Sequence, residues 1–344
     1  MKQMKKYLTF LLAAAMLFTM TACGSVGKWI VQIDGTEVPV GVYNLYESIY
    51  YQYSVYYVSD SSKSPLKQEI KKDDDTTVTG AQWIQENALS TVKNMVAVER
   101  ECARLGLTLT ENEQALVKEN VASSWDSNGA TYEKIGVGKA SLTYVYQNGQ
   151  YNEKLFDYLY GENGTDAVME SAIAQYFEQN YTDLNYFTVS LIGSDGKTIS
   201  DDEKAKIKTE LEQLSDQINS GAKTFDQVVA DYNKAHSSAT VTGNSRTVIV
   251  GDAFSEAIAT AINDCPEGKA AVASTDYYMY FISKNRIADV KESYLAENLS
   301  TLRHEMKDDA FAEYVSDVMD QLTMTINDAA VNKYTPKWIE KHNG

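Results

Sequence analysis

The stretches NYFTVSLI (Asn185–Ile192) and YYMYFI (Tyr277–Ile282) mark the two ends of the segment that decides the fold. Aromatic and β-branched residues dominate both stretches, a composition that favours β-strands. Between them, S-D-D-E from Ser200 and T-F-D-Q from Thr224 are capping boxes, and each predicts the start of a helix. Two strands that enclose two well-marked helices predict a compact α+β module over residues 185–287.

Three stretches of this module resemble the parvulin-type prolyl isomerases. The stretch NSGAKTFDQVVADYNKAHSS (Asn219–Ser238) resembles the family's run of helix end, glycine, phenylalanine and second helix. GDAFSEAIATAINDCPEGK (Gly251–Lys269) resembles its short helix and glycine turn, and YYMYFISKNRI (Tyr277–Ile287) resembles its last strand. The resemblance implies a parvulin-like module with an apolar pocket for proline, in which Phe254 keeps the pocket aromatic.

The histidine content of the module differs from that of the family. Parvulins use two histidines, one on the first strand and one on the last, with a cysteine or aspartate between them. Matching to the family places Tyr186 and Tyr278 at the two histidine positions. The three histidines of the chain, none of which lies on a framing strand, are His236, His304 and His342.

Two neighbouring positions also bear on catalysis. Ala235 falls where parvulins have the cysteine or aspartate, and His236 beside it is either a displaced catalyst or a solvated loop residue. Lowering the ~18–20 kcal/mol barrier to rotation about a peptide bond requires polar groups held against the twisted amide in a desolvated site. We therefore expect no catalytic residues in this module. We expect Tyr186, Phe254 and Tyr278 to bind extended, apolar segments of a client protein.

The amino terminus has the pattern of a bacterial lipoprotein signal. Three lysines precede the apolar run Tyr7–Met20, which predicts a secretory signal peptide over residues 1–22. The ending M-T-A-C-G-S resembles a lipobox, so Cys23 is expected to become the lipidated first residue, with residues 23–28 as anchor and tether. The alternative is ordinary signal cleavage beside an incidental cysteine. The lipobox implies an extracytoplasmic protein that is lipid-anchored to a bacterial cell membrane.

Charge and spacing exclude several classes of function. The net charge of the chain is -17, and removal of the three signal lysines takes it to -20. An acidic body opposes binding to nucleic acid, and it serves either solubility or the attraction of basic clients. Gly193–Thr198 contains G-K-T, but Leu191 stands where a phosphate-binding loop needs its first glycine, so no nucleotide is expected. The two remaining cysteines, Cys102 and Cys265, make no metal-ligand cluster, and neither a metal nor another cofactor is expected.

The mature chain opens with a hairpin and a helix. Apolar alternation over Trp29–Ile33 and the D-G turn at Asp34 predict the hairpin, and the helix follows from about Gly41. The phrase V-x-I-D-G-x-E-V-P resembles the start of the PrsA and SurA extracytoplasmic foldases. That resemblance implies a helical chaperone domain over residues 29–184, around a parvulin module.

The first helix is rich in tyrosine and offers candidate client-binding residues. Its apolar stripe predicts core positions at Val42, Leu45, Tyr46, Ile49, Tyr53 and Tyr56. The tyrosines outside the stripe are Tyr43, Tyr50, Tyr51 and Tyr57. We expect Tyr43 and Tyr50 to line a groove, since tyrosine offers a large apolar face at low conformational-entropy cost. Alternatively these tyrosines pack under a flap. Residues 59–80 would form that flap, since they are predicted to be a polar loop with too little apolar content to pack.

Long amphipathic segments predict that the rest of the chain is helical. The predicted helices are Ala81–Leu105, one from Thr110, Ser141–Tyr160, Ala167–Tyr181 and Val290–Met324, with a short strand at Met324–Ile326. An isolated amphipathic helix is marginal in water, so residues 288–344 are expected to pack back on the amino-terminal half rather than form an independent tail. The predicted fold is therefore α+β: a mainly helical chaperone domain formed by both terminal segments, with the parvulin-like module inserted into it.

Three functions are compatible with this pattern. The first is a membrane-anchored, ATP-independent chaperone or foldase that holds unfolded secreted or envelope proteins and has an inactive parvulin-like module. The second is an active peptidyl-prolyl cis-trans isomerase that uses Phe254 and the tyrosines. The third is a surface lipoprotein that binds one ligand or partner through the face from Tyr43 to Tyr57. The lipobox, the foldase-like helices and the missing histidines favour the first.

Overall fold

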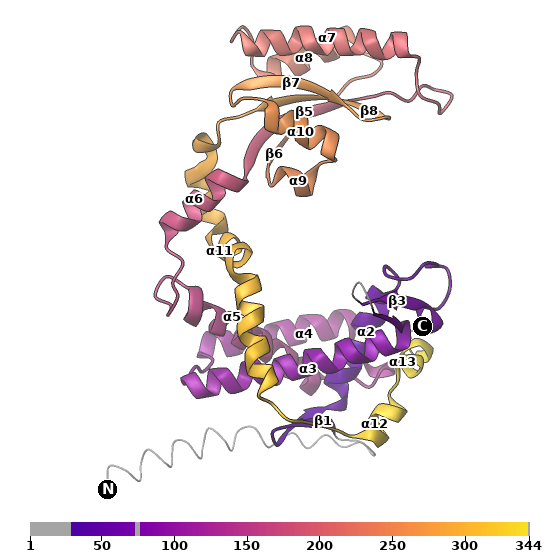
Figure 1. Ribbon diagram of the computed structural model, residues 1–344, viewed down its shortest axis with the longest axis vertical. Helices are drawn as coiled ribbons and strands as arrows, with labels where there is room; N and C mark the ends of the chain where they lie inside the picture. Colours follow the sequence, from indigo (N-terminus) through magenta and orange to yellow (C-terminus); the bar gives the residue numbers. More distant parts are fainter. Residues whose placement is uncertain (1–28, 73–75, 343–344) are drawn as a thin grey trace. The chain divides into compact units, whose positions relative to one another are not determined.

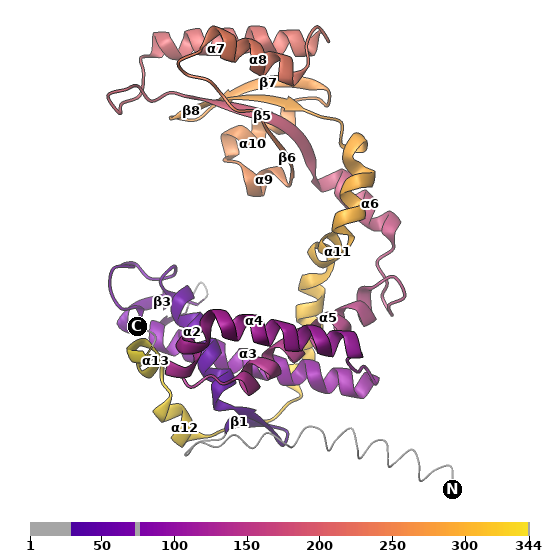
Figure 2. The ribbon, with the colours of Figure 1, turned by 180° about the vertical axis from the view of Figure 1, so that it is seen from behind.

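The computed structural model describes residues 29–72 and 76–342 of the 344-residue chain, and Figures 1 and 2 show it from opposite sides. The expected signal peptide, the lipidation site Cys23 and its tether lie outside the described residues. The chain divides into two compact units. One, here called the helical body, comes from residues 1–166 and 308–344, and the other, the inserted module, is Ala167–Lys307. Both terminal segments contribute to one unit, and the second unit is inserted between them. Each unit combines helices with an antiparallel sheet, so the predicted α+β class is confirmed.

A three-stranded antiparallel sheet joins the two ends of the helical body. The predicted hairpin is present as β1 (Trp29–Ile33) and β2 (Thr36–Pro39). Its turn residues Asp34 and Gly35 have φ of 44° and 87°, and two positive φ values fit the tight turn that D-G favours. On the other edge of β1 lies β9 (Met324–Ile326), so the carboxy-terminal segment packs back on the amino-terminal half.

The helices of the body begin and end at signals that the sequence carries. Thr110 and Glu113 form the reciprocal bonds of the predicted capping box, and Gly106 ends the preceding helix with a φ of 73°. Ile339, in the last helix, is fully buried in a cluster with residues of the first, third and fourth helices. The helices are α2 (Val40–Ser54), α3 (Gly80–Leu105), α4 (Glu111–Lys134), α5 (Lys139–Tyr160), the second part of α11 (Ile287–Asp320), α12 (Asp328–Lys333) and α13 (Pro336–His342).

The prediction that residues 59–80 do not pack was wrong. This segment contains a short 3-10 helix, η1 (Pro65–Lys67), and a hairpin of β3 (Glu69–Lys71) and β4 (Thr77–Thr79). Its few apolar side chains are enough to hold the segment against α3, because three of them are buried: Pro65, Leu66 and Ile70.

The inserted module is built on a four-stranded antiparallel sheet with the order β6-β5-β8-β7. The capping boxes at Ser200 and Thr224 both form, as predicted, and start the two longer helices of its core. The elements of the module are α6 (Glu170–Asn180), β5 (Thr182–Ser190), α7 (Asp201–Asn219), α8 (Phe225–Ala235), β6 (Asn244–Val248), α9 (Val250–Ala253), α10 (Glu256–Asp264), β7 (Lys269–Ser274), β8 (Tyr278–Lys284) and the first part of α11.

Each face of this sheet carries its own apolar cluster. On one face, Phe187 and Phe281 stack at 4.9 Å and pack against α7 and α8. On the other face, Leu184 and Ile282 pack against the short helices α9 and α10. Figure 1 shows the two helix pairs on opposite sides of the sheet. The first face is covered by long helices and the second by short ones, so the second face is where side chains of the sheet reach solvent.

Two strands of the module were missed. No strand was predicted over residues 244–248 or residues 269–274, whereas they form the two edge strands, β6 and β7. Among the described residues, no helix combines the length and the apolar character needed to cross a bilayer.

Candidate functional site

Three aromatic side chains meet on the sheet face of the module that carries α9 and α10; we call them the aromatic cluster. Tyr186 lies on β5, Tyr280 on β8, and Phe254 caps the end of α9. The ring centroids of Tyr186 and Phe254 are 5.7 Å apart at 86°, and those of Tyr186 and Tyr280 are 6.3 Å apart at 22°. All three side chains are half-buried, so their outer edges face solvent.

The pairing of the strands brings a cation to this cluster. Arg246 on the edge strand β6 lies opposite Leu184, on the same face as Tyr186. Its guanidinium carbon is 5.8 Å from the centre of the Tyr186 ring, within the range of a cation–π interaction. No ion pair of Arg246 is recorded in the described part of the chain, and its side chain is exposed.

The structure changes the membership of the predicted site. Tyr186 and Phe254 come together as expected, but Tyr280 completes the cluster in place of Tyr278. Tyr278, the first residue of β8, lies on the same face two residues before Tyr280, with 46% of its surface exposed and no ring contact to the cluster recorded among the described residues. Strand alternation places both tyrosines on one face, and only the position of α9 decides which of them touches Phe254.

His236 lies on the other side of the sheet from the cluster. It follows α8, stacks on Tyr232 at 4.3 Å and shares a 2.7 Å hydrogen bond with Glu210 of α7. Tyr232 belongs to the apolar cluster around Phe187, which is the opposite face from Tyr186. The alternative in which His236 acts as a displaced catalyst at the aromatic cluster is therefore excluded by its position.

The chemistry available at the aromatic cluster is apolar contact and cation recognition. Within the described residues, no histidine, cysteine or carboxylate is recorded in a ring contact or hydrogen bond with its three rings. A surface of this kind offers aromatic faces, the hydroxyls of Tyr186 and Tyr280, and one guanidinium. A hollow recorded on the module lies elsewhere, along α7, and its lining comes from that single helix.

A second aromatic surface, here called the tyrosine patch, lies on the helical body where α2 ends. Tyr53, Tyr56 and Tyr57 expose 53%, 81% and 60% of their surfaces. Trp83 of α3 packs against Tyr57, with their ring centroids 5.2 Å apart. Isolated exposed apolar residues are normal on soluble proteins, but several large ones gathered in one place indicate a binding surface.

Three tyrosines of this region lie in environments opposite to the predicted ones. Tyr53 and Tyr56 were assigned to the core, but both are exposed: Tyr53 lies in the last turn of α2, and Tyr56 lies beyond the end of the helix at Ser54. Tyr43 was expected to line a groove, but it is fully buried between α2 and α3 and donates a 2.6 Å hydrogen bond to Glu47. Tyr43 is therefore a core residue and no part of the binding surface.

Tyr50 has an intermediate position. Its ring meets Trp83 edge-on at 5.7 Å, and its hydroxyl shares a 2.8 Å hydrogen bond with Thr91. Tyr50 is half-buried and contacts the tyrosine patch through Trp83.

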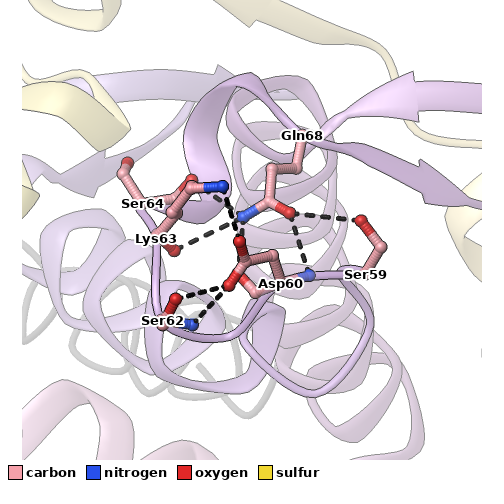
Figure 3. A network of polar contacts seen from close by, with 6 residues as sticks. All are labelled: Ser59, Asp60, Ser62, Lys63, Ser64 and Gln68. Carbon is pink, nitrogen blue, oxygen red and sulfur yellow. Dashed lines mark hydrogen bonds and ion pairs between the residues drawn. The ribbon is translucent and has the colours of Figure 1, made fainter.

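The loop that follows the tyrosine patch is fixed by one side-chain amide (Figure 3). The amide nitrogen of Gln68 donates to the carbonyl oxygens of Asp60, Lys63 and Ser64, at 2.9, 3.4 and 3.1 Å, and its oxygen accepts from the backbone N–H of Asp60 at 3.1 Å. Asp60 pairs with the Lys63 ammonium at 2.7 Å and accepts from the hydroxyl of Ser62. The patch is thus followed by an ordered turn.

Comparison with known proteins identifies similar structures at low sequence identity. No family model and no curated protein matches the chain. The foldase protein PrsA from Streptococcus pneumoniae matches at 14% identity with a TM-score of 0.34, over 78% of this chain and 99% of that one. PrsA from Lactococcus lactis matches at 12% identity with a TM-score of 0.35, over 90% of this chain and 100% of that one. A SurA-like chaperone from Campylobacter jejuni matches at 12% identity with a TM-score of 0.30, over 87% of this chain and 99% of that one. These are the families that the sequence motifs resemble, and at such identities and TM-scores no activity is inferred from the likeness.

Proposed function

We propose that this chain is an ATP-independent chaperone that holds unfolded secreted or envelope proteins. The tyrosine patch carries this proposal, because three tyrosines close together in the sequence expose half or more of their surfaces, and one of them, Tyr57, packs on Trp83. Tyrosine pairs a rigid apolar face with a hydroxyl, so it binds varied partners at low cost in side-chain entropy. An exposed surface of this chemistry suits segments whose apolar residues are not yet buried.

The inserted module supports the same proposal as a second binding surface. Its aromatic cluster is open at the edges, and Tyr186 in it stands where the parvulin resemblance places the first histidine. The strongly acidic chain keeps such a holder soluble while its apolar surfaces stay exposed. Client holding is the activity that these surfaces allow, and catalysis is not required for it.

Membrane anchoring through Cys23 is the remaining part of the proposal. It rests on the lipobox-like M-T-A-C-G-S in the sequence. Mass spectrometry of the amino-terminal peptide from the membrane fraction tests it. A lipid-modified Cys23 is expected. An unmodified cysteine on a freely released protein would contradict the proposed lipid anchor, but it would not bear on the proposed client-holding activity.

Removing the tyrosine patch is expected to abolish most client binding. The triple variant Tyr53→Ser, Tyr56→Ser, Tyr57→Ser of the chain from Gly24 onward removes three exposed aromatic faces, together with the ring contact of Tyr57 with Trp83. Since aromatic anchors each contribute about 1 kcal/mol or more at binding surfaces, affinity for a chemically unfolded client should fall about tenfold or more. Light scattering of an aggregating client and titration with a labelled one measure the change.

The matched control for that experiment is Tyr277→Ser. Tyr277 exposes 57% of its surface, like the patch tyrosines, but lies on the module outside the aromatic cluster. Equal losses in both variants would mean that exposed tyrosine in general, and not the patch, attracts clients. Binding of one folded partner with no affinity for unfolded chains would instead indicate a ligand-specific lipoprotein.

The purified protein is expected to show no prolyl isomerase activity above the uncatalysed rate. Tyr186 and Tyr278 stand where the parvulin resemblance places the two histidines, so we expect too little electrostatic stabilisation of the twisted amide, which is the largest part of such catalysis. A protease-coupled assay on proline peptides measures the rate. Catalysis that disappears in Phe254→Ala would contradict this expectation and make the module an enzyme.

A further inference from the structure

Backbone hydrogen bonds fix which groups of the module's sheet face inward. Asn285 donates its N–H to the carbonyl of Asp183 at 2.9 Å, and Leu191 donates to the carbonyl of Tyr277 at 2.8 Å. In an antiparallel pair, alternate residues of a strand bond to alternate sides. The odd-numbered residues of β5 therefore bond to β8, and its even-numbered residues bond to β6.

The same alternation determines the free groups of β6. The register pairs Thr182, Leu184 and Tyr186 of β5 with Val248, Arg246 and Asn244 of β6. These three residues of β6 consequently bond toward β5. The N–H and C=O groups of Ser245 and Thr247 point away from the sheet, and no hydrogen bond of either backbone is recorded on that side within the described residues.

The opposite edge of the sheet is closed by a side chain. Ala270 of β7 donates its N–H to the side-chain oxygen of Asn219 at 2.7 Å, and the Asn219 amide nitrogen donates to the Ala270 carbonyl at 3.1 Å. Asn219 thus takes the place of a neighbouring strand, and α7 packs along β7. Proteins protect edges in this way because unpaired strands recruit other chains. No helix or strand of the described chain packs in this way along the outer edge of β6.

We propose that the outer edge of β6 binds an extended segment of a client as an added β-strand. Two outward donors and two outward acceptors at alternate residues match the spacing of a strand's own backbone groups. Arg246 and Tyr186 lie on one face of this edge, so an added strand places alternate side chains beside them, and a carboxylate there pairs with the free guanidinium. The occupant is thus an extended segment with alternating apolar side chains and an acidic one. The inference rests on the proposed chaperone function and names how its clients are held.

A labelled octapeptide of alternating valine and threonine with one central glutamate tests this edge. Ser245→Pro removes an outward N–H without breaking a bond to β5, because edge strands tolerate proline where the N–H faces solvent. Ser245→Ala keeps that N–H and is the matched control. In the mature chain, we expect Ser245→Pro to weaken peptide binding at least tenfold by fluorescence anisotropy and Ser245→Ala to leave it within twofold.

Hydrogen exchange on the unaltered chain gives a second readout that needs no variant. Addition of the peptide is expected to slow exchange of the Ser245 and Thr247 amides tenfold or more and to leave that of Arg246, already bonded to β5, unchanged. No peptide binding, equal binding by Ser245→Pro and Ser245→Ala, or protection caused by pairing of two copies through β6 would each overturn the proposal. The tyrosine-patch variant should still bind the peptide, so failure of client holding and failure of the β6 edge are distinguishable.

Discussion

A chain that ends at Gln321 is expected to lose the cooperative fold of the helical body. The deletion removes β9, which pairs with β1 through Val31↔Ile326, and it removes Asn327, whose N–H bonds the Ile30 carbonyl at 2.9 Å. It also removes Ile339 from the cluster of α2, α4 and α5. Circular dichroism during thermal unfolding should show the loss of the unfolding transition of the helical body. The transition of the inserted module should remain, because the module keeps its own sheet and core.

Two point variants sharpen that expectation. Ile339→Ala empties a fully buried position, which costs roughly 2–5 kcal/mol in comparable cores. Ile326→Ala is the control, because Ile326 also lies in the carboxy-terminal segment but exposes 39% of its surface. Urea unfolding should show a large loss of stability for the first and a small one for the second. Equal stability of the truncated and complete bodies would mean that the last segment is an independent tail.

Glu47→Gln is expected to stabilise the helical body at pH 8 and to change little at pH 5. Glu47 is fully buried in α2, and burial raises the pKa of its carboxyl to about 8, against the hydrogen bond from Tyr43 that lowers it. One carboxylate oxygen has no partner, which fits a carboxyl that stays neutral. Glutamine keeps the shape and the bond from Tyr43 without a charge to bury.

The direction of the pH effect follows from proton linkage. Between the unfolded pKa of 4.5 and about 8, the folded state keeps a proton that the unfolded state has lost. The contribution of Glu47 to stability is therefore fully present below the unfolded pKa and is lost as the pH rises through this window. By pH 8 the difference between wild type and Glu47→Gln is on the order of 3 kcal/mol.

Urea unfolding at pH 5 and pH 8 measures this difference. Glu69→Gln is the control, because Glu69 is exposed on β3. Burial also raises the pKa of the Glu99 carboxyl, to about 7. Glu47→Gln should therefore reduce the pH dependence of the stability of the wild type and not remove it. A stability gain of equal size at both pH values would mean that Glu47 is ionised in the folded chain.

Local chemistry made much of the fold predictable from the sequence. The capping boxes at Thr110, Ser200 and Thr224 and the D-G turn at Asp34 act through bonds within a few residues, so each forms as its sequence indicates. The insertion of the module followed from the last amphipathic segment, which needs a partner for its apolar face.

The missed strands depend on partners distant in the chain. The residues N-S-R-T-V of β6 have weak strand propensity, and they form a strand because β5 supplies hydrogen bonds to Asn244, Arg246 and Val248. The alanine-rich β7 is likewise held by β8 on one side and by Asn219 on the other. Neither contact is visible from local composition.

The candidate site was predicted by residue type better than by position. An aromatic cluster without histidine was foreseen, but strand alternation does not say how far α9 reaches along β8, so Tyr278 was chosen where Tyr280 makes the contact. Tyr43 of α2 is fully buried, and the end of the helix at Ser54 leaves Tyr56 outside the helix and exposed. Helix periodicity alone could not place that end.

Photo-crosslinking from the tyrosine patch tests the central claim most directly. A benzoylphenylalanine in place of Tyr57 should crosslink to a chemically unfolded client and not to the same client once folded. The same probe in place of Leu116, which exposes 48% of its surface on α4, should give little product with either. Crosslinking from Leu116 as strong as from Tyr57, or none from Tyr57, would contradict client holding at the patch.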